Sequence, residues 1–176
     1  MRKEYGAALR DIFTTLLTKA CGEFVPVKKH APLAGYPGER AYCWRVSEVL
    51  FNWVVLVPDQ DREVFFVELG WSRRGRFPQL TMRPSALRPG EAAGQDEYLC
   101  RLGELSRDND EGWAIESLRA DATQEDMMAY LVAQTTPVTP EVARGRVTPL
   151  VEQAVSELQR FGLPFLRTQG KSRNIG

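Results

Sequence analysis

Two apolar segments with a short polar turn between them constrain the fold of this chain more than any other feature. Leu50–Val57 and Glu63–Trp71 are rich in β-branched and aromatic residues, which is typical of strands. The intervening Pro58–Arg62 is polar and short enough to join them in a hairpin. Because both faces of this hairpin are apolar, we expect it to lie centrally in a sheet, with helices covering at least one face.

Two polar residues, Asn52 and Glu68, interrupt the apolar hairpin. A register that sets residue 54 opposite residue 68 puts both side chains on one face, close together across the strand pair. An enzyme built on this chain would need a carboxylate such as Glu68 acting beside Asn52 in a cleft.

A helix is predicted before the strands, because apolar side chains recur at spacings of three and one over residues 5–20 and Gly22 follows as a C-terminal cap. Alternating residues predict a strand over 41–46, and Trp113–Glu116 predicts a short one. Spaced apolar side chains over 95–106 predict a short helix.

Three further helices are predicted towards the C-terminus. Thr123, with Asp126 three residues later, resembles a capping box, and Thr139–Pro140 and Thr148–Pro149 each combine an N-cap with a proline suited to a first turn. The last helix is expected to end at Gly162. Helix, strands and then helices indicate an α+β fold, with an antiparallel sheet on which the N-terminal helix and the C-terminal helices pack.

The composition is that of an ordinary globular domain, with 176 residues of which 43% are hydrophobic and 26% are charged. We expect residues 1–168 to form a single α+β domain and residues 169–176 a flexible C-terminal tail. Charged residues interrupt the N-terminal segment, and no apolar run approaches the roughly 20 residues of a membrane helix. The chain is therefore expected to be soluble, cytoplasmic and free of membrane association.

The sequence carries few residues suited to catalysis or metal binding. His30 is the only histidine, and Cys21, Cys43 and Cys100 are too widely spaced for a zinc motif or a disulfide framework. A Cys–His dyad stays formally open, although no activating group lies beside either Cys21 or Cys43 in the sequence. Phosphate-loop and dinucleotide-binding motifs are absent. We predict no metal, no cofactor and no enzymatic activity.

Charge is segregated along a chain whose net charge is zero. Residues 1–90 carry 14 basic and 9 acidic side chains, whereas residues 91–140 carry 3 and 11. The zero total argues against generic nucleic-acid binding, which needs a basic surplus. The arginine-rich Arg73–Arg88 stretch has two interpretations: local pairing with the acidic segment that follows it, or a small-molecule or nucleic-acid binding module of unknown role.

The acidic segment, residues 91–126, has two interpretations as well. It forms either a solvated face that aids solubility or a docking face for a basic protein partner, where complementary charge accelerates association. Trp113 lies inside this segment. An exposed Trp113 would suit an interface anchor, whereas a buried one would belong to the core.

The helix ending in Leu16–Leu17, the strand Tyr42–Arg45 and the stretch Phe65–Gly70 resemble a bacterial family of unknown function, numbered four-three-zero-four. Later counterparts are Gly112–Trp113 and Gly162–Leu166, so the resemblance covers residues 5–168. The family implies no catalytic residues. In style such domains are similar to the immunity proteins encoded beside secreted toxins, which is an analogy.

Together these features favour a binding protein. The leading hypothesis is a cytoplasmic immunity protein that binds a cognate bacterial toxin domain and neutralises it by occluding the active site. The predicted partner-binding residues are Glu104, Asp108, Asp110, Glu111, Trp113, Glu116 and Asp121.

Overall fold

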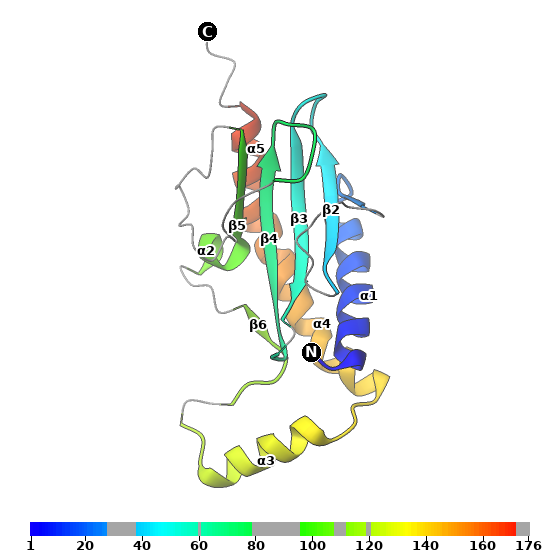
Figure 1. Cartoon of the computed structure of the whole chain (residues 1–176), viewed down its shortest axis with the longest axis vertical. Coiled ribbons are helices and arrows are strands. Elements are labelled where there is room, and N and C mark those ends of the chain that lie inside the picture. Colours follow the sequence, from blue (N-terminus) through cyan, green and yellow to red (C-terminus); the bar gives the residue numbers. More distant parts are fainter. Residues whose placement is uncertain (28–37, 60, 79–95, 108–111, 119–120, 172–176) are drawn as a thin grey trace.

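The computed structural model describes residues 1–27, 38–59, 61–78, 96–107, 112–118 and 121–171. In these ranges the chain forms an N-terminal helix, an antiparallel sheet and C-terminal helices (Figure 1), which confirms the predicted α+β class. No helix of the described ranges is both long and apolar enough to cross a membrane.

The sheet has the order β1-β2-β3-β4-β5, and every neighbouring pair is antiparallel. A sixth strand pairs with the start of β4, beyond the end of β5 on the same edge. The predicted central hairpin is confirmed as β3 and β4. The strands are β1 (Val25–Pro26), β2 (Arg40–Arg45), β3 (Phe51–Pro58), β4 (Val64–Ser72), β5 (Glu97–Arg101) and β6 (Trp113–Ala114).

The register of the hairpin differs from the prediction by one residue. Val55 lies opposite Glu68, and Asn52 lies opposite Trp71. Because side chains alternate along a strand, this slip places Asn52 and Glu68 on opposite faces of the sheet. Asn52 faces the helices, and Glu68 faces away from them beside Arg101, whose Nε lies 4.0 Å from the Glu68 carboxylate. The predicted pairing of Asn52 with Glu68 is therefore wrong.

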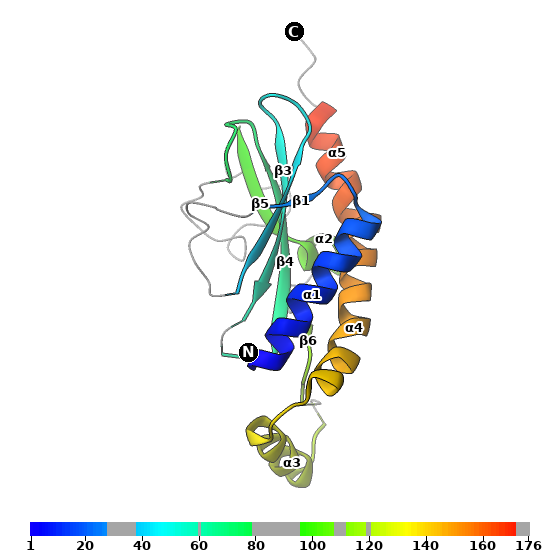
Figure 2. The same ribbon diagram turned by 90° about the vertical axis from the view of Figure 1, so that its right-hand side faces the viewer.

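Helices α1 (Lys3–Ala20) and α4 (Pro140–Glu157) lie side by side on one face of the sheet (Figure 2). The apolar stripe predicted for the first helix is buried between them and the sheet, where each large side chain contributes about 1.5–3 kcal/mol. A smaller apolar cluster lies on the other face. The hairpin thus buries apolar side chains on both of its faces, as the sequence predicted.

Three predicted boundaries are wrong. Residues 97–101 of the predicted helix form β5, and only α2 (Leu102–Ser106) is helical, because the exposed edge of β4 supplies backbone partners for Glu97–Arg101. Pro149 does not begin a new helix but lies inside α4, where burial of residues such as Val147 and Val151 outweighs its cost of about 3 kcal/mol.

The third concerns the C-terminus. The chain does not leave its helical path at Gly162 but continues through a π-helical turn, Leu158–Gly162, into α5 (Leu163–Lys171). Leu163 and Leu166 are buried against the sheet side of the core, which explains why the helix continues. The first three residues of the predicted tail are therefore helical, and residues 172–176 lie outside the described ranges.

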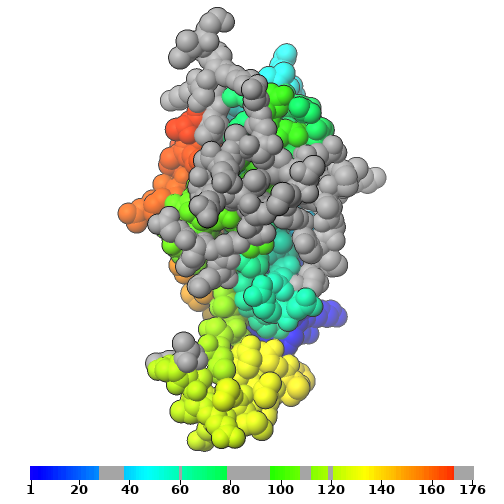
Figure 3. Space-filling view, turned by 60° about the vertical axis from the view of Figure 1, so that its left-hand side comes forward, coloured from blue at the N-terminus to red at the C-terminus, as the bar shows by residue number. Residues whose placement is uncertain are grey.

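Helix α3 (Gln124–Thr135) extends away from the sheet and the other helices (Figures 1 and 3). Its start is the predicted capping box, since the Thr123 hydroxyl accepts from the Asp126 amide and the Asp126 carboxylate accepts from the Thr123 amide. None of its twelve residues is buried. We call α3 the arm.

Candidate protein-docking surface

A largely buried carboxylate, Glu116, is one of two charged side chains that attach the arm to the body. This side chain is 9% exposed and forms ion pairs with Arg2 and Arg146. It also accepts hydrogen bonds from the Tyr5 hydroxyl and from Nε2 of Gln134, the latter at 3.1 Å. Burial, together with the hydrogen bond to Glu116, raises the pKa of Tyr5, so the phenol stays protonated and donates. Glu116 thus ties α1 and α4 to the C-terminal half of the arm.

Arg2 completes this attachment. Its guanidinium donates to the Ala133 carbonyl oxygen over 2.9 Å, at the end of the arm, and pairs with Glu63 at the start of β4, also at 2.9 Å. The charged side chains at the C-terminal end of the arm therefore pair with one another inside the protein. They do not cover the two sides of α3 that run along its length.

The arm holds four of the nine exposed large apolar side chains of the described residues. Met127 is 43% exposed, Met128 and Leu131 are 58% exposed, and Val132 is 61% exposed. The sequence predicts that these residues form the apolar side of the helix that begins at Thr123, and the structure places them on the surface. Their positions are i, i+1, i+4 and i+5, which at 100° per residue place all four within about 140° of one side of the helix, so their spacing does not distinguish an open helix from a packed one.

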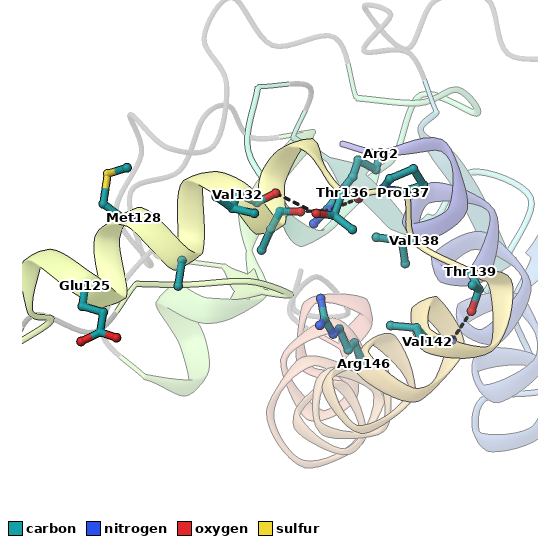
Figure 4. Close-up of a pocket in the computed structure, with 12 residues that line it drawn as sticks. Arg2, Glu125, Met128, Val132, Thr136, Pro137, Val138, Thr139, Val142 and Arg146 are labelled. Atoms are coloured by element: carbon teal, nitrogen blue, oxygen red, sulfur yellow. Dashed lines mark hydrogen bonds between the residues drawn. The ribbon is translucent and has the colours of Figure 1, made fainter.

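Residues three or four apart share one side of a helix, and this divides the arm into two faces. The outer face carries Asp126, Met127, Tyr130 and Leu131. The groove face carries Glu125, Met128, Ala129, Val132 and Ala133, which line a groove of about 660 Å³ between the arm and the start of α4 (Figure 4). Val142 and Arg146 line the groove from the α4 side.

The outer face continues into a second hollow, of about 470 Å³, at the N-terminal end of the arm. Its lining includes the carboxylates of Asp121 and Asp126, beside Leu118 and Tyr130. Hydrogen bonds from Thr123 hold the pKa of Asp126 below its ordinary value, so this carboxylate is charged at neutral pH. We call Asp121 and Asp126 the acidic tip.

Among the predicted partner-binding residues that the structure describes, Glu104, Trp113, Glu116 and Asp121 do not lie together on one surface. Glu104 is half-buried on α2, whereas Asp121 is exposed at the tip of the arm. Glu116 is the buried attachment described above. Asp108, Asp110 and Glu111 lie outside the described residues.

Trp113 belongs to the core and is not an exposed anchor. It is 3% exposed and stacks on Phe65, with the ring centroids 5.4 Å apart. Gly112 before it has φ +71°, and a Cβ there would lie 2.7 Å from the Phe65 carbonyl oxygen, so only glycine fits this turn into β6. Of the two interpretations of Trp113, the structure supports the core residue.

The described arginines that follow β4 pair locally. Arg74 Nη2 lies 3.3 Å from Asp96, and Arg76 Nη1 lies 3.1 Å from Glu97, while the guanidinium of Arg73 lies over the Trp71 ring. This confirms, for Arg74 and Arg76, the interpretation as local pairing with the acidic segment. The remaining arginines, Arg83 and Arg88, lie outside the described residues.

The thiols and carboxylates of the described ranges form no cluster of three that could hold a metal ion. Cys21 and Cys100 are buried and Cys43 is half-buried. Burial raises the pKa of Cys21 and of Cys43 to about 11, and it raises the pKa of Cys100 further. His30 lies outside the described residues, so the structure does not place the Cys–His dyad.

Comparisons with known proteins return no matching family model, no similar curated protein and no similar solved structure.

Proposed function

We propose that this chain is an immunity-type protein that binds a basic bacterial toxin domain and neutralises it by covering the active site. The observation that carries the proposal is the arm, a helix of twelve residues that buries none of its side chains. A helix of this length is marginal in water on its own, so its exposed apolar residues favour a partner protein.

The outer face of the arm supplies the chemistry for such a partner. Met127 and Leu131 form an apolar pair four residues apart, and the acidic tip lies beside them. Apolar anchors next to unlike charge are typical of protein interfaces, where charge sets the association rate and orientation. The proposed contact surface is thus the outer face and the acidic tip. Of the residues predicted from the sequence, it retains Asp121.

The proposed role includes a cytoplasmic location, because an immunity protein meets its toxin in the cytoplasm that the toxin would otherwise damage. The resemblance to the bacterial family of unknown function is compatible with this role and stays a proposal.

The test begins with capture of partners from the native host and expression of any stoichiometric partner alone. The association rate of the purified pair is then measured with the native chain and with an Asp121→Lys/Asp126→Asn variant. Asn at position 126 keeps an oxygen that can accept from the Thr123 amide, so the capping box is retained. A control variant, Glu48→Lys/Glu152→Gln, makes the same change in net charge at exposed acids away from the arm.

We expect a partner that is toxic when expressed alone and harmless with this chain. Loss of the acidic tip should slow association on the order of tenfold at low salt, and the control variant should associate at the native rate. A partner that binds the tip variant and the native chain equally fast would remove this surface from the proposal. The absence of any toxic partner would refute the immunity role itself.

A further inference from the structure

The groove face of the arm also exposes large apolar side chains, as does the opposite wall of the groove. Met128 and Val132 are 58% and 61% exposed, and Val142 on the opposite wall is 43% exposed. These side chains lie on the two helices that face each other across the groove (Figure 4). The groove is therefore an open apolar surface rather than a packed contact between the arm and α4.

The groove is also polarised along the arm. Glu125 lies at the N-terminal end of its α3 wall, and Arg2 and Arg146 line it near the C-terminal end of α3, where Arg2 donates to the Ala133 carbonyl oxygen. Arg146 keeps about half of its side chain exposed, at 47%, although it pairs with Glu116. A guanidinium has five N–H donors, so Arg146 can donate hydrogen bonds to a second carboxylate.

We propose that the occupant of this groove is the arm of a second copy of the chain, packed antiparallel to the first about a two-fold axis level with residue 130, midway between Met128 and Val132. In that arrangement Met128 of each copy lies against Val132 of the other. Glu125 of each copy lies near Arg146 of the other, so unlike charges meet at both ends of the contact. The two helix macrodipoles are also antiparallel, which is the favourable orientation.

A second copy fits this groove better than a foreign helix for two reasons. A symmetric interface uses the same patch twice, and this patch contains both the projecting apolar helix and the groove that receives it. An isolated helix of twelve residues is marginal in water, so an arm without buried residues is stabilised by a protein that packs on it. A second copy of the chain is available for this as soon as the chain is made.

The dimer goes beyond the proposed function and does not depend on it, because the toxin would contact the outer face and the second copy the groove face. Variants of Met127 and Met128 distinguish the proposed toxin contact on the outer face from the proposed dimer contact on the groove face. They are adjacent, exposed methionines of one helix, and only Met128 lines the groove.

The experiment is analytical ultracentrifugation of the full chain over on the order of a hundredfold range of concentration. We expect the native chain to sediment as a dimer, at twice its mass of 19.9 kDa. Met128→Glu and Val132→Glu should each give a monomer with an unchanged circular dichroism spectrum, because neither side chain is buried. Met127→Glu should stay dimeric.

Three results would overturn the proposal. The first is a native chain that is monomeric throughout the range. The second is a dimer that persists in both Met128→Glu and Val132→Glu. The third is a dimer lost equally in Met127→Glu, because the contact would then not be confined to the groove face.

Cysteine cross-linking tests the orientation. Ala129→Cys lies next to the proposed axis, and it should form an intermolecular disulfide under mild oxidation. Glu125→Cys should not, because five residues at about 1.5 Å rise on each side of the axis separate the two thiols by roughly 15 Å along the helices, beyond the reach of a disulfide. Efficient cross-linking of Glu125→Cys with none of Ala129→Cys would overturn the antiparallel arrangement.

Discussion

Asn52 offers a prediction whose sign is unusual, since its replacement by Leu should stabilise the protein. The side chain is fully buried, and neither its amide nitrogen nor its amide oxygen has a hydrogen-bond partner among the described residues. It lies between Trp44 and Trp71 on the neighbouring strands and faces the helix side of the sheet with Val54. An unsatisfied amide therefore lies in an apolar environment.

The magnitude follows from the cost of that amide. A buried polar group without a partner costs about 1–3 kcal/mol, and Leu has nearly the shape of Asn, so little new strain is expected. We expect Asn52→Leu to raise the free energy of unfolding by about 2 kcal/mol. For a chain of this size, that corresponds to an increase in Tm of about 4–8 °C.

The assay is urea unfolding of the native chain and of two variants at position 52, supported by thermal unfolding. Asn52→Asp is the matched control, because it keeps the volume and introduces a charge, and it should destabilise the protein by several kcal/mol, roughly. The expected order of stability is Leu above Asn above Asp. A Leu variant less stable than the native chain would refute the reasoning, because the amide would then make hydrogen bonds that stabilise the fold.

Two further predictions concern Glu116 and the thiols. Glu116→Ala should lower the free energy of unfolding by about 3 kcal/mol and make the arm more sensitive to protease, because Arg2 loses a largely buried partner. The control Asp11→Ala breaks an exposed ion pair and should lower the free energy of unfolding by less than about 1 kcal/mol. Equal losses for the two variants in urea unfolding would contradict this. Burial raises the pKa of Cys21 and Cys43 from 9.0 to about 11, so these thiols should react slowly with a thiol reagent in the native protein near about pH 8. The free energy of unfolding should fall as the pH rises from 9.0 towards about 11, because the thiols of the unfolded chain lose their protons first. Rapid labelling of the native protein near about pH 8 would show that these sites are not buried.

The sequence determined the elements whose signal is local. Apolar spacing in residues 5–20, alternation in residues 41–46 and the apolar hairpin are properties of neighbouring residues, and the structure confirms each of them. The cap at Thr123 is local in the same way, because its two hydrogen bonds join residues three apart. From these elements alone the α+β class followed.

Features that depend on distant partners were set by packing and could not be predicted from neighbouring residues. Glu97–Arg101 became a strand because β4 offers a free edge, and α4 continued through Pro149 because its far side is buried. The hairpin register, which separates Asn52 from Glu68, is likewise set by packing on both faces. Because both faces are apolar, the sequence pattern does not distinguish this register from one shifted by a residue.

The same distinction governs the candidate site. The sequence indicated that charge is segregated and that Thr123 begins a helix, but Glu116 and Trp113 sit in the acidic segment without belonging to its surface. Residues far away in the chain, Arg2, Arg146 and Phe65, hold these two side chains inside. Whether an apolar helix packs on its own body or stands open as the arm depends on the space left by the other elements, and that space exists only once the chain has folded.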